Sequence, residues 1–285
     1  MSNICGCCNH VSDEFRVIDG FQYYLCPHCQ SILIDQDSLA SMDDGNPLVS
    51  YHENNEYWKN ELRAARERSF GCALARMAET FHYAKKRINK FIDIGTGPGY
   101  FLDAVKLHLP TSSEIFYGVE KYPPKPEERS TSSHYIVGDL GDIKLKFEAG
   151  MCIEVIEHLT PKMLDRLVGQ LTTVSENDAL FIFNTGMPEY VINDDTGYLD
   201  PTKRGHIASY SLQGINHLAN KNGFFAKPIP GKTWAFVLEK NQDQDNICDR
   251  IWKACPENLR SLEDPKMGSV LRILGLESAR AYLHQ

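Results

Sequence analysis

The sequence predicts an α/β protein built on a doubly wound, mostly parallel β-sheet, with a small N-terminal module and a helical C-terminal tail. Short β-prone runs alternate with helical patterns between residues 88 and 240, which favours parallel βαβ units. A glycine-rich turn follows the first of these runs, as in sheets that bind nucleotides at their carboxyl edge. Two pairs of closely spaced cysteines near the N-terminus indicate the separate module.

The composition is that of a globular protein. The chain has 285 residues, of which 42% are hydrophobic and 24% charged, and this length can bury a large core. Its net charge of -8 arises from 30 basic and 38 acidic residues. Because no basic block is present, the charge argues against a nucleic-acid partner bound by phosphate neutralisation.

The chain shows no targeting or membrane pattern. No apolar stretch approaches the roughly 20 residues of a membrane span, and the first residues do not read as a secretory signal. Nine cysteines without an export signal favour reduced thiols or metal ligands over disulfides. We therefore expect a cytoplasmic protein with no membrane span.

The cysteine pairs have the spacing of a zinc ribbon. Cys5 and Cys8 form the first pair and Cys26 and Cys29 the second, so that four thiolates can bind one zinc ion tetrahedrally. Such a closed site leaves no position for substrate, which favours a structural role over catalysis. A contribution of the ribbon to substrate or partner binding is the competing interpretation. Cys7 is either a spare thiol or an alternative ligand.

The ribbon is expected over residues 1–35, with a hairpin at Asp19-Gly20 between the cysteine pairs. Residues 36–87 are expected to hold a polar, turn-rich connection to about residue 55 and then a capping helix. The helix is indicated by apolar residues that recur every three or four positions over about seven turns. They are Trp58, Leu62, Ala65, Phe70, Leu74, Met77 and Phe81.

The third segment, residues 88–240, carries the predicted sheet. Its helices are expected over 99–109, from 161 to about 174, and over 212–222, and a strand pair over 224–229 and 233–240 can form an antiparallel edge. The other strands are expected over 90–95, 115–120, 134–139, 150–157 and 179–186.

The turn after the first strand has a distinctive glycine pattern. Asp93, Gly95, Gly97 and Gly99 alternate with other residues in "DIGTGPG", and glycines let the backbone approach a ligand closely. The dinucleotide fingerprint needs a further glycine where this chain has Tyr100, which makes NAD the second choice. This loop also has no lysine followed by serine or threonine, as a phosphate-binding P-loop requires.

Acidic residues follow successive predicted strands. Glu120 ends the second strand, where a carboxylate can accept both hydrogen bonds of a ribose diol. Asp139 follows the third strand and can accept an adenine amino group, while Asp93 can orient an ammonium or a water. Each acid alone is commonly a helix cap or a solvated turn residue, but their recurrence at strand ends favours a nucleotide site.

The order of "DIGTGPG", Glu120, "GDL" and "IEVIEHL" resembles the class I S-adenosylmethionine-dependent methyltransferases, over about residues 88–240. The resemblance implies a Rossmann-like sheet, S-adenosylmethionine as cofactor and methyl transfer as activity. The N-terminal cysteine pairs are similar to those of a subset of the family that modifies sugars or other small metabolites. This similarity implies a small-molecule or glycan acceptor. The cofactor residues implied by the resemblance are Asp93, Gly95, Thr96, Gly97, Gly99, Glu120, Lys121, Asp139, Leu140 and Glu154.

Methyl transfer from a sulfonium needs mainly alignment and exclusion of water, and a base only if the acceptor loses a proton. His158, in "EVIEHL", and His206, before a predicted helix, are the two candidate catalytic bases. A histidine that hydrogen-bonds a loop or caps a helix is the alternative for each. Tyr210 is a weaker candidate.

A rival reading assigns a second metal. Glu154, Glu157 and His158 together with His206 resemble the "ExxEH" metal residues of small-RNA 2′-O-methyltransferases and quinone O-methyltransferases. This resemblance implies divalent-metal-assisted O-methylation of an RNA 2′-hydroxyl or a catechol-like metabolite. However, "EVIEHL" is also common in methyltransferases that bind no metal.

The tail, residues 241–285, has a helical pattern with one apolar face. It can cap the main domain or form a homodimer contact. The alternative from a different functional class is a non-catalytic cofactor-binding or partner module.

Overall fold

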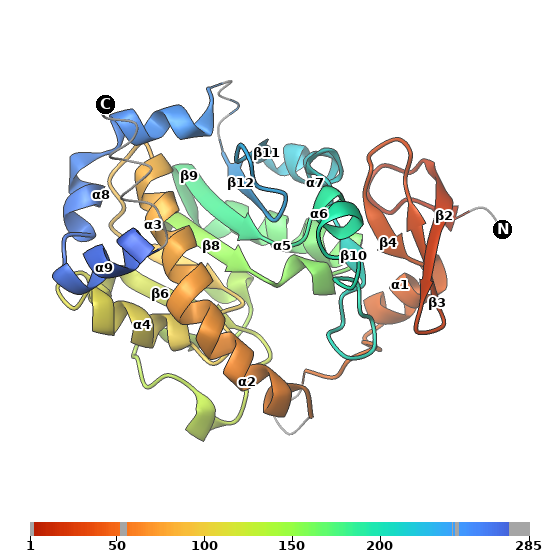
Figure 1. Cartoon of the computed structure of the whole chain (residues 1–285), viewed down its shortest axis with the longest axis horizontal. Helices are drawn as coiled ribbons and strands as arrows, with labels where there is room; N and C mark the ends of the chain where they lie inside the picture. Colours follow the sequence, from red (N-terminus) through yellow and green to blue (C-terminus); the bar gives the residue numbers. More distant parts are fainter. Residues whose placement is uncertain (1–2, 52–55, 241, 243–244, 274–285) are drawn as a thin grey trace. The chain divides into compact units, whose positions relative to one another are not determined.

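The computed structural model describes residues 3–51, 56–240, 242 and 245–273 (Figure 1). Its α-helices are α1 (Gln36–Asp43), α2 (Glu56–Arg68), α3 (Leu74–Tyr83), α4 (Tyr100–His108), α5 (Pro161–Val174), α6 (Pro188–Asn193), α7 (Leu212–Ala219), α8 (Pro256–Ser261) and α9 (Pro265–Ile273). A π-helical turn, η1 (Ser69–Ala73), joins α2 to α3. Short 3-10 helices are η2 (Ser113–Ile115), η3 (Pro126–Glu128), η4 (Leu140–Asp142), η5 (Ile156–His158), η6 (Asn220–Asn222) and η7 (Ile247–Lys253).

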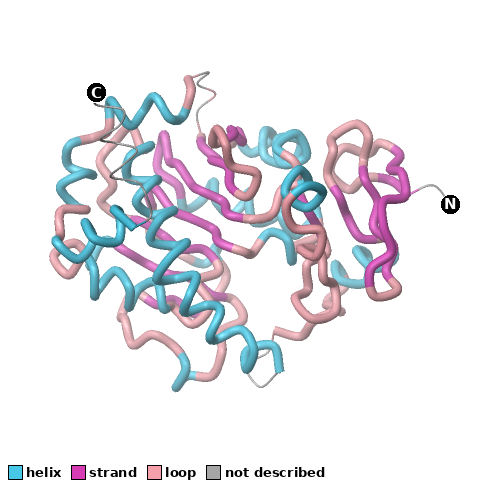
Figure 2. The backbone as a smooth tube through the Cα atoms, in the orientation of Figure 1, coloured by secondary structure: helices cyan, strands magenta, loops and turns pink. Residues whose placement is uncertain are grey.

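Two sheets contain all the described strands, drawn in magenta in Figure 2. The five-stranded sheet, in the order β1-β2-β3-β4-β10, consists of β1 (Asn3–Ile4), β2 (Val11–Ile18), β3 (Phe21–Leu25), β4 (Ile32–Ile34) and β10 (Ala208–Ser209). The seven-stranded sheet has the order β11-β12-β9-β8-β5-β6-β7. Its strands are β5 (Phe91–Ile94), β6 (Phe116–Glu120), β7 (Tyr135–Val137), β8 (Phe147–Ile153), β9 (Ser175–Asn184), β11 (Phe225–Pro228) and β12 (Ala235–Glu239).

The chain divides into two compact units. The first comprises Met1–Tyr51, Glu154–Thr173 and Phe183–Gln242, and the second comprises His52–Ile153, Val174–Ile182 and Asp243–Gln285. The second unit contains the glycine turn and the acidic residues near it. The first unit contains the four cysteines and, apart from them, Glu154, Glu157 and the two histidines. The units are therefore described separately below.

The centre of the larger sheet is parallel, as predicted. β5 pairs with both β6 and β8, and β6 pairs with β7, all in parallel. The register places Ile94, at the end of β5, opposite Val119 on β6 and Cys152 on β8. The segments that follow these strands therefore begin at the same carboxyl edge, which is where doubly wound sheets bind ligands. β11 and β12 form the predicted antiparallel pair.

The glycine turn follows a strand anchored by an aromatic cluster in the second unit. Phe81 on α3, Phe91 on β5, Phe101 on α4 and Phe116 on β6 are fully buried, and their ring centroids lie 5.6 to 6.0 Å apart in the contacting pairs. Burial of each ring stabilises the fold by roughly 2 to 3 kcal/mol. Phe91 and Phe101 flank the turn, so this packing fixes both of its ends.

The long apolar helix predicted after the connection is interrupted in the structure. α2 and α3 are separated by the five-residue π-helical turn η1. A π-turn shifts the helical phase, yet Trp58, Ala65, Leu74 and Phe81 are all buried as the pattern predicts.

Two local predictions differ from the structure. The segment expected as a polar connection contains α1, whose N-cap Asp35 accepts a hydrogen bond from the Ser38 N–H at 2.9 Å. The strand expected over 150–157 is β8, which ends at Ile153. Within the described residues, no helix has the length and apolar character needed to cross a bilayer.

Candidate functional site

The glycine turn after β5 has the backbone that its glycines allow. Gly95, Gly97 and Gly99 have φ values of 70°, 58° and 78°, in the left-handed region that favours glycine. At Gly99 an added Cβ would lie 2.5 Å from the Tyr135 ring, so any side chain there must displace that ring. The turn leads directly into α4.

Glu120, at the end of β6, is bound to this turn. Its Oε2 accepts a hydrogen bond of 2.8 Å from the Gly97 N–H, and its Oε1 accepts one of 2.8 Å from the Tyr122 N–H. Each carboxylate oxygen offers two acceptor positions, so the side chain can still accept further hydrogen bonds. Burial raises the pKa of Glu120, and the backbone N–H donors oppose that rise.

Asp93 is buried beneath the turn, with 4% of its surface exposed. Thr96 donates its hydroxyl hydrogen to Asp93 Oδ2 at 2.6 Å, and the turn is therefore tied to the strand that precedes it. Burial raises the pKa of Asp93 to about 7, the negative charge of Glu120 adds to the rise, and the Thr96 hydrogen bond opposes it. Near neutral pH this carboxyl can hold or release a proton.

The raised pKa predicts a pH-dependent stability difference. An unfolded aspartate titrates near ~3.9, so the stabilisation from protonated Asp93 is complete below about pH 4 and is lost as the pH rises through 7. The free energy of unfolding of Asp93→Asn, taken relative to that of wild type, should therefore rise by up to roughly 4 kcal/mol as the pH is raised from 4 to 8.

Urea denaturation of ligand-free protein at several pH values measures this difference. Asp142→Asn, at an exposed carboxyl, is the matched control and should leave the pH dependence of the wild-type protein unchanged. If the difference in unfolding free energy between Asp93→Asn and wild type did not vary with pH, this would contradict the raised pKa of Asp93.

Asp139, after β7, caps the short helix η4. Its Oδ1 accepts a hydrogen bond from the Gly141 N–H at 3.3 Å, and its Oδ2 pairs with Lys121 Nζ at 2.9 Å. Leu140 is buried next to it. The second unit thus brings together the turn, Glu120, Lys121, Asp139 and Leu140 through strands β5, β6 and β7.

Two aromatic residues outside the turn, Trp58 on α2 and Tyr135 on β7, lie against it and are absent from the site predicted from the sequence. The Tyr135 hydroxyl donates to the Gly97 carbonyl at 2.7 Å, and the Trp58 ring lies 3.6 Å from the position of a Cβ on Gly97. In the sequence, Trp58 is one of the apolar positions of the expected capping helix. Tyr135 begins the short strand β7. The sequence pattern of this strand gives no sign that the Tyr135 hydroxyl reaches back to the turn.

The first unit contains the other predicted residues, starting with Glu154. This residue directly follows β8 and has a φ of 52°, which costs a non-glycine residue of order 1 to 3 kcal/mol. Its N–H donates to the Asn184 carbonyl at 2.8 Å, and its carboxylate accepts from Asn184 Nδ2 at 2.9 Å and from the Tyr198 hydroxyl at 3.4 Å. These contacts hold the strained residue in place.

Glu157, His158 and His206 form a compact cluster in the same unit. One ligand-type atom of each lies within 4.8 Å of the others, and Glu157 Oε1 is 3.9 Å from His206 Nε2. The Thr185 hydroxyl donates to Glu157 Oε2 at 3.0 Å. Burial raises the pKa of Glu157.

Both imidazoles of this cluster are oriented by backbone carbonyls. His158 Nδ1 lies 3.1 Å from the Gly205 oxygen and 3.2 Å from the Tyr51 hydroxyl, and His206 Nδ1 lies 2.7 Å from the Tyr198 oxygen. A carbonyl only accepts, so each Nδ1 carries the proton. Tyr210, a weaker candidate, donates its hydroxyl to the Leu159 carbonyl at 2.6 Å, which is a structural role.

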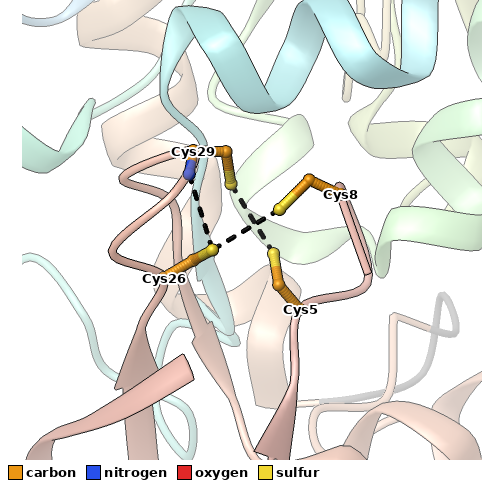
Figure 3. A group of neighbouring side chains, drawn as sticks. All are labelled: Cys5, Cys8, Cys26 and Cys29. Carbon is orange, nitrogen blue, oxygen red and sulfur yellow. Dashed lines mark hydrogen bonds between the residues drawn. The ribbon is translucent and has the colours of Figure 1, made fainter. Parts of the chain in front are cut away.

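The four predicted cysteine ligands meet at one point, as Figure 3 shows. The Sγ atoms of Cys5 and Cys29 are 3.6 Å apart, and those of Cys8 and Cys26 are 3.5 Å apart. A disulfide needs about 2.05 Å, whereas tetrahedral zinc with bonds of about 2.3 Å places sulfurs roughly 3.8 Å apart. The cluster therefore fits a zinc site.

Cys7 is buried beside this cluster but is not one of its four members. Hydrogen bonds to Cys29 and Cys5, together with burial, raise the pKa of the Cys7 thiol well above its ordinary value. Cys5, Cys8, Cys26 and Cys29 supply four thiolates without Cys7, as many as a tetrahedral zinc site takes, which favours the spare-thiol interpretation.

Comparison with solved structures identifies the fold. An O-methyltransferase family protein from Burkholderia thailandensis matches at a TM-score of 0.51 and 10% identity, over 73% of this chain and 69% of that protein. The chain has the class I methyltransferase fold.

Other methyltransferases match at TM-scores below 0.5. An S-adenosylmethionine-bound amino pentose methyltransferase from Micromonospora echinaspora has a TM-score of 0.48 and 15% identity, over 67% of this chain and 100% of that protein. For mitomycin 7-O-methyltransferase the values are 0.42 and 18%, over 59% of this chain and only 53% of that protein. No protein-family model and no curated protein matches the sequence.

Proposed function

We propose that the protein is an S-adenosylmethionine-dependent methyltransferase that acts on a small-molecule or glycan acceptor. The observation that carries the proposal is the turn after β5, where three left-handed glycines and the Gly97 N–H meet the Glu120 carboxylate. This turn lies at the carboxyl edge of a parallel sheet, and the methyltransferase fold of the chain supports the choice of cofactor.

In this proposal the turn holds the methionyl part of the cofactor and Glu120 accepts hydrogen bonds from its ribose. Asp139 and Leu140 contact the adenine, while Thr96 keeps Asp93 aligned beneath the turn. Lys121, paired with Asp139, also belongs to this set, and Glu154, in the first unit, stays a predicted cofactor residue. S-adenosylmethionine supplies an activated methyl group when bound.

The bases assigned to the acceptor are His158 and His206. With its proton on Nδ1, each imidazole has a lone pair on Nε2 that can take a proton from an acceptor hydroxyl. A bound S-adenosylmethionine would supply its methyl group to the deprotonated acceptor oxygen, and S-adenosylhomocysteine would leave as the second product. His158 is half-buried whereas His206 is buried, which favours His158 as the base that meets the acceptor.

The His158 assignment predicts a selective loss of rate. His158→Gln should lower kcat by about 100-fold or more, while the dissociation constant of S-adenosylmethionine stays within about twofold of wild type. His217→Gln, at an exposed histidine on α7, is the matched control and should retain both values. Unchanged kcat in His158→Gln would remove this residue from the proposed chemistry.

Labelled methyl transfer tests the function itself. The purified protein is incubated with methyl-labelled S-adenosylmethionine and extract fractions of small metabolites, glycans, RNA and protein. Label in metabolites or glycans is the expected result. Label in RNA or protein would overturn the acceptor class, and no label in any fraction would favour a non-catalytic binding module.

A further inference from the structure

We propose that Trp234 and Tyr190 form a subsite for an organic cation, and that the acceptor of the proposed reaction carries an ammonium group apart from the oxygen that is methylated. The subsite itself rests on the geometry of side chains in the first unit. Its part in acceptor recognition rests on the proposed function.

The subsite consists of two aromatic rings that remain accessible to solvent. Trp234, directly before β12, is 40% exposed, and Tyr190, on α6, is half-buried. Their ring centroids are 6.3 Å apart, and the ring planes are inclined by 63°. A single exposed aromatic residue needs no explanation. Adjacent rings that are inclined to each other, however, are the means by which aromatic cages recognise ammonium ligands.

Backbone hydrogen bonds within the first unit hold both residues in place. The Thr185 N–H donates to the Trp234 carbonyl at 2.9 Å. The N–H groups of Asp194 and Asp195 both donate to the Tyr190 carbonyl, each at 2.9 Å. Because the backbone is fixed in this way, the two rings can bind a ligand at a smaller cost in conformational entropy than rings on a loose loop.

Further aromatic rings connect this pair to the two candidate bases. Tyr198 lies between Tyr190 and His206, with ring-centroid distances of 5.8 Å and 4.7 Å. The His206 ring in turn lies 4.9 Å from the ring of His158. The exposed pair and the candidate bases therefore belong to one continuous cluster of rings, so that one acceptor can contact both.

The charged groups beside the pair favour a cation over a neutral ligand. The Asp194 carboxylate accepts a hydrogen bond from the hydroxyl of Thr233, the neighbour of Trp234, at 3.3 Å. The Asp195 carboxylate accepts one from the Gly197 N–H at 3.0 Å. Neither carboxylate forms a salt bridge with any residue in the part of the chain that the structure describes. Both negative charges thus remain available to attract a ligand cation.

The pKa of Tyr190 agrees with this negative environment. Burial raises the pKa, and the nearby carboxylates of Asp195, Glu154 and Asp194 add to the rise. The guanidinium of Arg204 opposes it. Three negative charges against one positive charge place the ring in a negative potential. Such a potential and the aromatic π-faces both attract an ammonium group.

Choline and its neutral isostere 3,3-dimethyl-1-butanol test the subsite, because the two molecules have the same shape and differ in charge. Each is titrated into the full-length, zinc-loaded protein, and saturation-transfer NMR on the probe methyl groups measures its dissociation constant. Wild type should bind choline about tenfold more tightly than the isostere.

Four variants localise this preference. Trp234→Leu and Asp194→Asn should each lower it to about threefold or less. Trp234→Phe keeps a π-face and should retain more of the preference than Trp234→Leu, which distinguishes a lost ring from a failure to fold. Trp252→Leu, at a tryptophan of the second unit that is 44% exposed, is the matched control and should bind choline like wild type.

Two results would overturn the subsite. The first is equal affinity of the wild-type protein for choline and its isostere, and the second is a preference that survives in both Trp234→Leu and Asp194→Asn. Binding of methyl glucoside that is lost in Trp234→Leu, without any preference for choline in wild type, would assign the rings to neutral sugars instead.

These outcomes separate the subsite from the proposed function. A preference for choline with no labelled product in any extract fraction would support the subsite and refute methyl transfer. Labelled product from a protein that shows no preference for choline would refute the subsite and leave methyl transfer in place.

Discussion

Gly97→Arg should lower the affinity for S-adenosylmethionine at least about 100-fold, or roughly 2.7 kcal/mol. Gly97 has a φ of 58°, and a Cβ on it would already touch the Trp58 ring at 3.6 Å. The longer arginine side chain must displace either that ring or the turn. It thereby disturbs the hydrogen bond from the Gly97 N–H to Glu120. This hydrogen bond positions Glu120, the residue proposed to bind the ribose.

Equilibrium dialysis with labelled cofactor measures this loss, and two alanine variants separate its causes. Gly97→Ala introduces only left-handed strain of about 1 to 2 kcal/mol and should weaken binding much less than arginine. Gly231 has a φ of 77°, and a Cβ added to it would meet no heavy atom within 4 Å. Gly231→Ala therefore carries similar strain and should bind the cofactor like wild type. Wild-type affinity in Gly97→Arg would contradict the assignment of the turn.

Cys29→Ser should remove one zinc per chain and unfold the ribbon. Cys29 is fully buried, and its Sγ lies 3.6 Å from that of Cys5. Structural zinc sites of this kind contribute about 10 to 16 kcal/mol of apparent binding free energy, most of which is folding free energy.

Elemental analysis and limited proteolysis of residues 1–35 measure the loss of zinc and of the ribbon fold. Cys255→Ser, at a half-buried cysteine of the tail, is the matched control and should keep both. Cys7→Ser should also keep the zinc. If Cys7→Ser lost the metal and Cys8→Ser retained it, the ligand set drawn in Figure 3 would be wrong.

Sequence patterns predicted the parts of the fold that depend on local periodicity. The strands around Phe91, Phe116 and Tyr135 and the helix after Gly99 lie where the alternation of apolar residues places them. The cysteine spacing likewise predicted a cluster that the structure brings together. In each case the residues that make up the sequence pattern, apolar side chains or cysteines, are also the residues that contact one another in the structure.

Features that depend on distant residues could not be predicted. β8 ends at Ile153 because Glu154 takes a left-handed conformation, held by Asn184, which lies thirty positions further along the chain. Tyr51 contacts His158 across 107 positions, and Thr185 contacts Glu157 across 28. Hydrogen bonds of this kind leave no periodic trace in the sequence, although Asn184 and Thr185 at a predicted strand end were an available signal.

Calorimetric titration of the wild-type protein with S-adenosylmethionine, and in parallel with NAD⁺, tests the central claim most directly. The geometry of the turn and Glu120 predicts one bound S-adenosylmethionine per chain and no measurable heat from NAD⁺ at the same concentrations. Binding of NAD⁺ in preference to S-adenosylmethionine, or of neither, would contradict the account.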